Sequence, residues 1–355
     1  MQNILDLAPK PGNPRNSEGA FLKLRDGRLI FCWSKYSGSD FADYAPADIA
    51  AIFSDDGGDT WYGDRILFKH TQFDQADNKC KNIMSVSLMR MADGAVGLYF
   101  LVRMSSPDMA LWLFRSYDEG KTFDNGVRCT GHKGYYVTNN DRVLMLKNGR
   151  IIVPANYHQT VNGNIEQASR GCVYISDDDG ASFKQGGSFN MELDMDNGHG
   201  LQETGVIELD DGRLWAFSRT KVGRHYGCFS SDGGLTWTKP RPSRFTGPCS
   251  PLSIKRADCG SYVAVWNPIP YYNGQHYSPW TGGRTPLVAC LSDDGLNWGH
   301  TTLVDGDAED AGYCYTAIHF EGENLLLAYC AGGEADRHNL CRLRIKKLAL
   351  SELFK

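Results

Sequence analysis

The stretch that decides the predicted fold is Ser54-Asp55-Asp56-Gly57-Gly58-Asp59-Thr60-Trp61. Four related copies follow, starting at Ser116, Ser176, Ser230 and Ser292, at intervals of 62, 60, 54 and 62 residues. Each copy carries short Ser and Asp side chains that can bond turn amides, glycine for a positive φ, and a final aromatic ring. This chemistry is typical of a hairpin turn and not of catalysis.

A second and weaker repeat has a similar period. Short turn sequences occur six times, 47 to 67 residues apart: Asp26-Gly27, Asp93-Gly94, Asn148-Gly149, Asp211-Gly212, Asp258-Cys259-Gly260 and Glu321-Gly322. Apolar runs flank most of them, which is a strong hairpin signal. Each unit therefore predicts four strands joined by a tight turn, a longer loop and a Ser/Asp turn. Six such units predict an all-β chain, a six-bladed β-propeller with four-stranded antiparallel blades, formed as one domain by residues 1–355.

The sixth unit lacks a Ser/Asp turn. A blade that ends after three strands would leave an unpaired edge. We therefore expect a strand from the other end of the chain to complete it.

Composition excludes several classes of function. The net charge is -5, whereas a nucleic-acid partner usually requires a basic surface. No apolar run approaches the ~18 residues of a membrane span. Residues 1–9 show no secretory signal, so we expect a cytoplasmic protein, or an exported one if a leader has been removed. The eleven cysteines are scattered and the histidines lack a ligand pattern, so buried free thiols, no metal site and no cofactor are expected.

The strand order predicts which residues share a face. The tight turns and the Ser/Asp turns lie together on one side, the turn face, and the starts of the first strands lie with the longer loops on the other, the loop face. Ionisable and polar residues gather at the predicted loop face near the axis: Arg15, Asp43, Asp48, Asn82, Arg103, Asp141, Arg142, His158, Glu203, Arg219, Ser250, Asn267, Arg284 and Tyr313. A purely structural propeller has no need for so many, so the loop face is the predicted site.

The Ser/Asp turns resemble the Asp-boxes of the sialidase (neuraminidase) superfamily. Asp-boxes also occur in binding propellers and other hydrolases, so the segments between them carry more weight. Those segments match along essentially the whole chain. Arg15 stands where the family's Arg-Ile-Pro begins, and the run from Asp43 through Asp48 to Ser54 resembles its acid/base loop. The family's Glu-then-Arg segment, third arginine and Gly-Tyr-Ser resemble, in that order, Glu203-Thr204-Gly205-Val206 followed by Arg219, Arg284, and Gly312-Tyr313-Cys314.

This resemblance implies an exo-α-sialidase that releases terminal sialic acids from glycoconjugates with retention of configuration and without a cofactor. A sialic acid carries a carboxylate on its anomeric carbon. The resemblance implies that Arg15, Arg219 and Arg284 hold this carboxylate through charge-assisted bonds. Arg142 and Asp48 are further candidates for substrate binding.

The resemblance also implies the catalytic groups. A carboxylate nucleophile would be repelled by the substrate's carboxylate, and a neutral tyrosine avoids this. Tyr313 is the expected nucleophile, Glu203 its base, and Asp43 the acid/base that protonates the leaving oxygen. The sequence leaves alternatives open. Tyr315 competes with Tyr313, whose spacing from Gly312 favours it, and Asp40 or Asp48 with Asp43.

Simpler roles are also open for two arginines. Arg15 could be a surface residue that pairs with Glu18, and Arg142 could simply pair with Asp141.

The chain departs from the family pattern at three places: Asn16-Ser17 replaces Ile-Pro, Asn82-Ile83 replaces Asp-Pro, and Tyr329-Cys330 stands where many members carry the Glu that braces the first arginine. These departures indicate a divergent branch. Two other functions therefore remain: a propeller glycosidase for another terminal sugar, such as another 2-keto acid or arabinose, and a glycan-binding propeller without activity. Converging arginines would favour an acidic sugar, whereas the binding-only propeller predicts that Asp43, Glu203 and Tyr313 do not meet.

Overall fold

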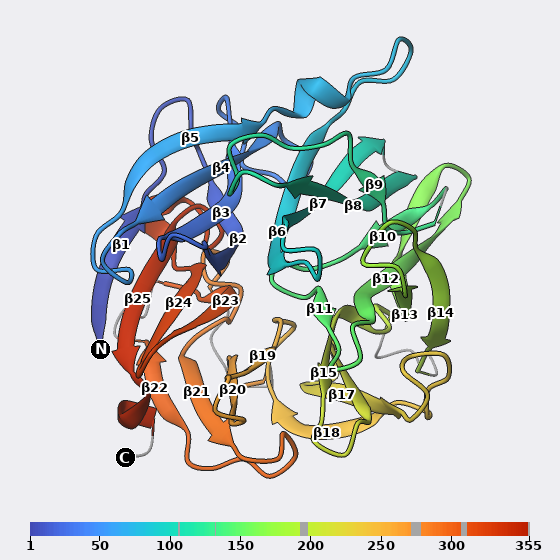
Figure 1. Ribbon diagram of the computed structural model, residues 1–355, viewed down its shortest axis with the longest axis vertical. Coiled ribbons are helices and arrows are strands. Elements are labelled where there is room, and N and C mark those ends of the chain that lie inside the picture. Colours follow the sequence, from blue (N-terminus) through green and yellow to red (C-terminus); the bar gives the residue numbers. More distant parts are fainter. Residues whose placement is uncertain (106, 132, 192–197, 271–277, 307–310, 354–355) are drawn as a thin grey trace.

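The computed structural model describes residues 1–105, 107–131, 133–191, 198–270, 278–306 and 311–353. Its strands form six blades around a central axis (Figure 1). The helices in this part of the chain are three short 3-10 turns, η1 (His70–Phe73), η2 (Glu334–Asp336) and η3 (Leu350–Leu353). Among the described residues, no helix has the length and apolar character that a membrane crossing requires.

Three blades are separate four-stranded antiparallel sheets. Blade 1 contains β2 (Asn16–Lys23), β3 (Leu29–Tyr36), β4 (Ala47–Ser54) and β5 (Tyr62–Phe68). Blade 4 contains β15 (Gln202–Glu208), β16 (Leu214–Arg219), β17 (Arg224–Ser230) and β18 (Arg241–Thr246). Blade 5 contains β19 (Ser253–Arg256), β20 (Tyr262–Trp266), β21 (Leu287–Ser292) and β22 (Thr302–Asp305). In each blade the first strand is the innermost, as the sequence predicts.

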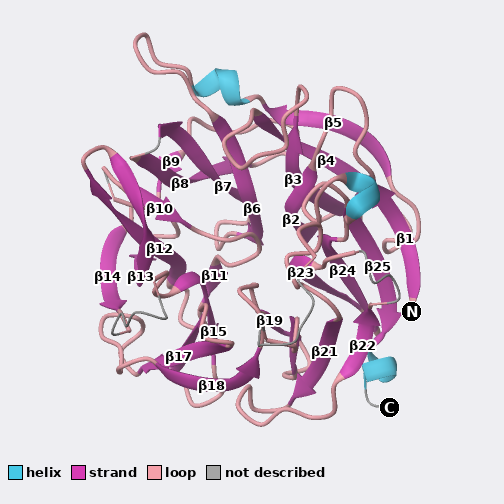
Figure 2. Cartoon of the chain, turned by 180° about the vertical axis from the view of Figure 1, so that it is seen from behind, coloured by secondary structure: helices cyan, strands magenta, loops and turns pink. Residues whose placement is uncertain are grey.

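Blade 6 is built from both ends of the chain. Its strands β23 (Cys314–Glu321), β24 (Asn324–Cys330) and β25 (Leu343–Ala349) are completed by β1 (Gln2–Leu7), which pairs antiparallel with β25. Figure 2 shows β1 beside β25 at the rim, close to both termini. The predicted closure of the sixth blade is confirmed.

Blades 2 and 3 depart from the simple pattern because one short strand joins them. Blade 2 contains β6 (Asn82–Arg90), β7 (Val96–Ser105), β8 (Asp108–Ser116) and β9 (Val127–Arg128), and blade 3 contains β11 (Leu144–Met145), β12 (Ile151–Val161), β13 (Asn164–Ser176) and β14 (Lys184–Phe189). The connecting β10 (Tyr135–Val137) runs parallel to β8 and antiparallel to β12, so the two blades share one nine-stranded sheet.

Six hydrophobic clusters hold the ring together, one between each pair of neighbouring blades. Blade 1 packs on blade 6 through Phe31 and Leu326, for example, and blade 5 on blade 6 through Val265 and Leu327. Every blade is therefore covered on both faces, which explains why its strands are nearly continuous apolar runs. The eleven cysteines are all free; nine are buried, six of them in these clusters.

Five Asp-boxes close the outer hairpins on the turn face. In the first, Asp56 Oδ1 accepts the N–H of Thr60 at 2.9 Å, and Asp56 Oδ2 accepts the Thr60 hydroxyl at 2.6 Å. The Ser54 hydroxyl donates to Asp56 and accepts the N–H of Gly58, both at 2.8 Å. The Ser-to-Asp and Gly-to-Ser bonds recur in the other four boxes. The boxes therefore act as turns, far from the loop face.

Candidate active site on the loop face

A repeated backbone distortion directs side chains into the centre of the ring. The innermost strand of four blades shifts register at its start, and the first residue of each shift has a positive φ: Glu18 (58°), Ser85 (60°), Glu203 (48°) and Tyr315 (58°). A β-bulge of this kind re-aims a side chain, and a positive φ in a non-glycine residue is uncommon and often found at functional sites. Equivalent positions of four blades therefore supply the central polar groups.

Side chains from other blades satisfy the backbone groups that the bulges release. Asn140 Nδ2 donates to the carbonyl oxygens of Gly19 in blade 1 and Tyr315 in blade 6, at 2.8 and 3.0 Å. Asn156 Oδ1 accepts the N–H of Thr204 at 2.7 Å. Because buried backbone groups need such partners, these bonds hold the bulged residues in place.

Tyr315 and Glu203 form the central pair. The Tyr315 hydroxyl donates to Glu203 Oε1 at 2.8 Å, and Glu203 Oε2 lies 3.1 Å from Arg219 Nη1. Burial and the negative charge of Glu203 raise the pKa of Tyr315 well above its usual value, against the opposing charges of Arg219 and Arg284. The tyrosine is therefore neutral, with a carboxylate in position to take its proton.

Two arginines flank this pair. Arg219 Nε and Nη2 donate to Gln202 Oε1 at 3.3 and 2.9 Å. The Arg284 guanidinium lies over the Tyr315 ring, 5.4 Å from its centre, and Nη1 is 3.1 Å from Cys314 Sγ. These contacts orient both guanidiniums beside the tyrosine.

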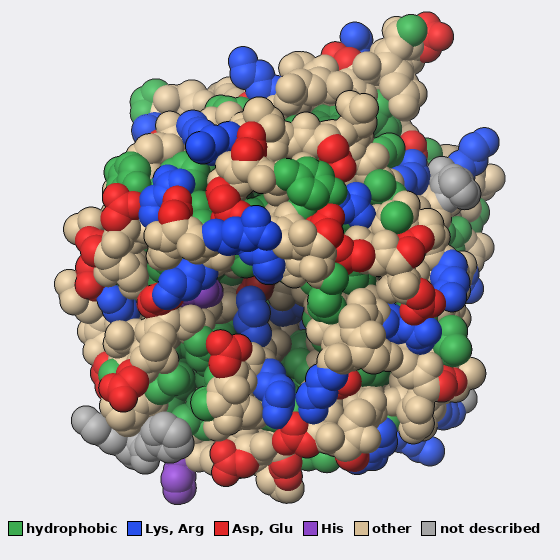
Figure 3. Space-filling view, in the orientation of Figure 1, with side chains coloured by type: hydrophobic (Ala, Val, Ile, Leu, Met, Phe, Trp, Pro, Cys, Tyr) green, Lys and Arg blue, Asp and Glu red, His purple; other side chains and the backbone are tan. Residues whose placement is uncertain are grey.

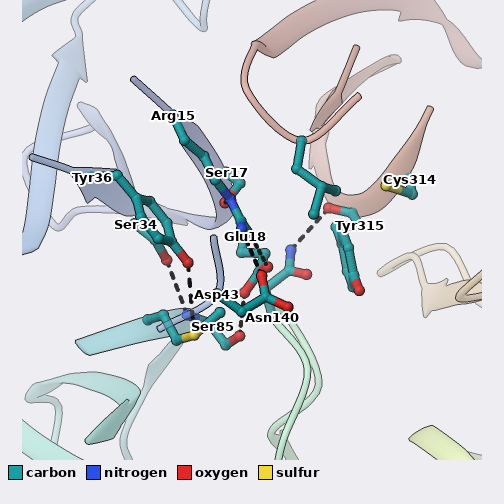
Figure 4. Close-up of polar contacts among 12 residues, drawn as sticks. Arg15, Ser17, Glu18, Ser34, Tyr36, Asp43, Ser85, Asn140, Cys314 and Tyr315 are labelled. Carbon is teal, nitrogen blue, oxygen red and sulfur yellow. Dashed lines mark hydrogen bonds and ion pairs between the residues drawn. The ribbon is translucent and has the colours of Figure 1, made fainter. Parts of the chain in front are cut away.

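The third arginine lies in an acidic cluster (Figure 4). Arg15 is 1% exposed; it donates from Nη1 to Asp43 Oδ1 at 2.6 Å and from Nη2 to Glu18 Oε1 at 3.0 Å. Glu18 also accepts the hydroxyl of Ser85. Burial raises the pKa of the Glu18 carboxyl above its usual value, although Arg15 opposes the change. The Arg15–Glu18 pair that the sequence allowed thus exists, but inside the molecule and shared with Asp43.

The loop that carries Asp43 is tied to blade 2. The backbone carbonyl of Asp43 accepts hydrogen bonds from Asn82 Nδ2 at 2.5 Å and from Arg103 Nη1 at 2.6 Å. Desolvation alone would raise the pKa of the Asp43 carboxyl, but the charges of Arg15, Arg103 and Arg284 outweigh it and hold the pKa below its usual value. Asp43 is therefore ionised while Arg15 holds it, and its side chain, 62% exposed, faces open space.

The acidic cluster and the tyrosine pair face the same space. Asn140 donates to the Gly19 carbonyl, next to Glu18, and to the Tyr315 carbonyl. Figure 4 shows Glu18, Asp43 and Tyr315 gathered around Asn140. The Arg284 guanidinium lies over Tyr315, and its charge helps to lower the pKa of Asp43. The structure thus brings together Arg15, Arg219, Arg284, Asp43 and Glu203, with Tyr315.

A basic cavity of about 650 Å³ lies beside the Asp43 loop. Its lining includes Lys79, Lys81 and Arg103, together with His70 and the rings of Tyr44 and Tyr135, and no acidic side chain contributes among the described residues. The cavity therefore offers an anionic group both charge and aromatic surface.

Among the described residues, no group of three His, Cys, Asp or Glu side chains is placed to hold a metal ion. The arrangement instead offers organic acid, base and nucleophile groups.

The family description "BNR repeat-like domain" matches residues 23–325. The chain belongs to the BNR repeat-like family. Solved structures similar to this BNR domain include a protein of unknown function from Dyadobacter fermentans (16% identity; 98% of this chain, 99% of the other; TM-score 0.73). Another is the NanB sialidase of Streptococcus pneumoniae (15% identity; 99% of this chain, 71% of the other; TM-score 0.73). A third is the intramolecular trans-sialidase of Ruminococcus gnavus (15% identity; 99% of this chain, 98% of the other; TM-score 0.73). No curated protein matched significantly.

These similarities establish the fold of the BNR domain. At 15–16% identity they leave the activity to be argued from the site itself.

Three of the site residues expected from the sequence lie elsewhere in the BNR domain. Tyr313 is 1% exposed in the cluster between blades 5 and 6, where its ring centre lies 6.1 Å from that of Tyr329. Asp48 accepts the backbone N–H of His70 at 2.8 Å and lies 2.7 Å from its Nδ1, and so caps η1. Arg142 binds the Leu252 carbonyl oxygen at 2.6 Å, below the central pair. The tyrosine that reaches Glu203 is Tyr315, the alternative left open by the sequence.

The sequence analysis missed the roles of Glu18, Gln202, Ser85 and Asn140. A comparison of the blades with one another could have found the bulged positions. In each of the four blades a small residue stands two positions after the bulged residue: Ala20, Ser87, Gly205 or Ala317. Glu18 also fills the place of the absent brace, because it holds Arg15 although Tyr329-Cys330 replaces the usual Glu.

Proposed function

We propose that this BNR domain is an exo-α-sialidase that cleaves terminal sialic acids with retention of configuration. The observation that carries the proposal is the Tyr315–Glu203 hydrogen bond of 2.8 Å, with Arg219 and Arg284 beside it and Arg15 facing the same space. A neutral nucleophile surrounded by guanidiniums suits an anomeric carbon that bears a carboxylate. The structural similarity to sialidases supports the proposal at the level of the fold.

The first step follows from these positions. Arg15, Arg219 and Arg284 bind the substrate carboxylate, and this orients the anomeric carbon over Tyr315 Oη. The Tyr315 oxygen forms a bond to the anomeric carbon while its proton passes to Glu203. Asp43 gives a proton to the leaving glycosidic oxygen, so the aglycone departs as an alcohol.

Asp43 must be protonated for this role, although Arg15 holds it ionised in the empty site. A substrate carboxylate competes with Asp43 for the Arg15 guanidinium. The loss of that partner raises the pKa of Asp43, so binding of the correct substrate converts it to an acid. In the second step Asp43 accepts a proton from water and the water oxygen bonds to the anomeric carbon. The bond between that carbon and the Tyr315 oxygen breaks, and Glu203 returns its proton to the tyrosine.

The basic cavity beside Asp43 favours acidic glycans over neutral ones. Because of this cavity and the three arginines, we favour a sialidase over a glycosidase for an arabinose-type sugar and over a propeller that only binds glycans. If the substrate's own hydroxyl replaces water, the product is an anhydro sugar, as in intramolecular transfer. Product analysis distinguishes the two.

The test is covalent trapping. A 3-fluoro sialosyl fluoride forms its tyrosyl adduct quickly and releases it slowly, so mass spectrometry of the protein should find one label, on the peptide that contains Tyr315. Fluorophore release from an α-ketosidic sialoside, compared with a panel of neutral glycosides, should show turnover of the sialoside alone. A label on Tyr313 or on a carboxylate would overturn the assignment of the nucleophile. The absence of both label and turnover would overturn the sialidase proposal.

A further inference from the structure

A second cavity, of about 610 Å³, opens at the other end of the central channel. Its walls include residues late in the inner strands, such as Leu88 of β6, Val206 of β15 and Arg256 of β19, whereas the bulges of the loop-face site lie at the starts of inner strands. The cavity therefore belongs to the turn face. Figure 3 shows this face, with a hollow near its middle and Lys and Arg side chains beside it.

Arg142 lies at the inner end of this cavity and is buried, with 5% of its surface exposed. Its guanidinium makes two hydrogen bonds, from Nη2 to the Leu252 carbonyl at 2.6 Å and from Nη1 to Ser253 Oγ at 3.3 Å. A guanidinium has five N–H donors, so three remain, and Nε has no acceptor among the described residues.

No carboxylate of the described residues forms an ion pair with Arg142. Asp141, its neighbour in sequence, instead accepts Lys255 Nζ at 2.8 Å and the backbone N–H of Ile318 at 2.9 Å. Burial lowers the pKa of Arg142 to about 10, against the partial compensation from Asp141, Glu203 and Tyr315. A buried cation without an anionic partner destabilises a protein, and a bound anion would remove that cost.

The rest of the cavity suits an anion with an apolar body. Five cationic side chains line it, and four of them are paired with carboxylates: Lys255 with Asp141, Arg90 with Glu119, and both Lys147 and Arg256 with Asp210. Arg142 is the lining cation that has no ion pair among the described residues. Apolar side chains such as Val143, Met145 and Phe217 line it between these charges. Small-molecule sites combine mostly apolar walls with a few polar groups that fix orientation, and their volumes run from about 300 to 1,000 Å³.

We propose that the turn-face cavity binds a small amphipathic carboxylate, with the carboxylate toward Arg142 and the apolar body against Val143, Met145 and Phe217. This site is distinct from the proposed sialidase centre, because its lining includes none of the residues of that centre: Arg15, Asp43, Glu203, Arg219, Arg284 and Tyr315. The inference therefore stands whether or not the loop face cleaves sialosides.

Three probes separate charge from apolar contact: octanoate carries both, acetate the charge alone, and octan-1-ol the chain alone. Isothermal titration calorimetry of the full chain should show octanoate binding at least about tenfold more tightly than either of the other two. Equal affinity for octanoate and octan-1-ol would overturn the role of Arg142, and the absence of octanoate binding would overturn the site.

Two variants and a control test the location. Arg142→Met removes the charge and should weaken octanoate binding at least about tenfold. Arg213→Met is the matched control, because Arg213 lies on the same face, paired with Asp211 at 2.7 Å and outside the cavity. Val143→Trp keeps Arg142 and fills the cavity, so it too should abolish binding, even if Arg142→Met fails to fold. Unchanged octanoate affinity in folded Val143→Trp would place the ligand elsewhere and overturn the proposal.

Discussion

Glu203 in blade 4 and Tyr315 in blade 6 occupy the same bulged position of their innermost strands, and a 2.8 Å hydrogen bond joins their side chains across the channel. The pair therefore depends on the closure of the whole ring and not on one local segment. Two tyrosines two residues apart, Tyr313 and Tyr315, provide a sharp test of this relationship.

Tyr315→Phe removes the oxygen that contacts Glu203 and leaves the ring. We expect kcat on an α-ketosidic sialoside to fall about 100-fold or more, because a positioned reacting group is lost. The KM should change little, since the arginines remain. Steady-state kinetics measure both.

Tyr313→Phe is the matched control, because it removes one hydroxyl from a residue 1% exposed in the cluster between blades 5 and 6. We expect a lower melting temperature and nearly normal kcat per folded molecule. The opposite result, a kcat loss confined to Tyr313→Phe, would return the nucleophile to Tyr313.

Arg284→Lys tests the binding of the substrate carboxylate. Lysine keeps the charge but loses the planar fork that lies over Tyr315. We expect a strong rise in KM and weaker inhibition by carboxylate-bearing sialic acid analogues. Arg244→Lys, at an exposed position in β18, should leave both unchanged. If an analogue without a carboxylate lost affinity equally, Arg284 would be structural.

Glu18→Gln tests the brace on Arg15. Glutamine keeps the size and one hydrogen-bond acceptor but removes the charge that faces Arg15 Nη2 at 3.0 Å. We expect Arg15 to be less well held and KM to rise about tenfold, with a smaller change in kcat. Glu323→Gln, an exposed glutamate, is the control. A fall in kcat at constant KM would instead give Glu18 a role in the chemical step.

Asp232→Ala tests the Asp-boxes as structural elements. It removes an acceptor that binds the N–H groups of Leu235 and Thr236 at 3.0 and 2.9 Å and the Thr236 hydroxyl at 2.6 Å. We expect unfolding by urea to show a loss of about 1–2 kcal/mol. The rate per folded molecule should be unchanged, because the box lies on the turn face. A large loss of rate in the folded variant would contradict the placement of the site.

The same residue predicts a pH dependence. Hydrogen bonds, that of the Thr236 side chain foremost, lower the pKa of Asp232 to about 2. A carboxyl whose pKa is depressed by folding stabilises the fold above its unfolded pKa and loses that contribution as the pH falls through the folded value. The melting temperature of the wild type should therefore fall more steeply than that of Asp232→Ala between about pH 4 and 2. If the melting temperatures of the two proteins fell in parallel with pH, the lowered pKa of Asp232 would be contradicted.

The blades could be predicted from the sequence because their signals are local. Each Asp-box is complete within eight residues, and the period of the boxes sets the number of blades. The β10 bridge between blades 2 and 3 could not be predicted, because its three residues carry no turn or repeat signal and its partners, β8 and β12, are distant in the chain.

The site was harder to predict at its centre than at its edge. Arg15 and Arg219 lie at strand ends and Asp43 in a longer loop, so their place on the loop face follows from the predicted strand order. Tyr315 competed with Tyr313 because residues two apart point the same way in a regular strand, and the spacing from Gly312 favoured Tyr313. The positive φ of Tyr315 breaks that alternation, so Tyr313 turns between the blades while Tyr315 faces Glu203. Arg142 stays a prediction as a substrate ligand. Its backbone position near the loop face does not reveal that its side chain bonds to Leu252 and Ser253 and lines the cavity of the turn face.

The completion of blade 6 by β1 also bears on how the protein is made. During synthesis β1 leaves the ribosome long before its partner β25, because the residues between 7 and 343 must be made in the interval. Blades 1 to 5 can pair their strands as they emerge, but the edge of β1 must wait until those five blades and β25 have been made. The exposed pattern of that strand, with charged and polar residues among its apolar ones, reduces the risk that it pairs with another nascent chain meanwhile. Pairing across this sequence distance makes closure the slow step expected in folding.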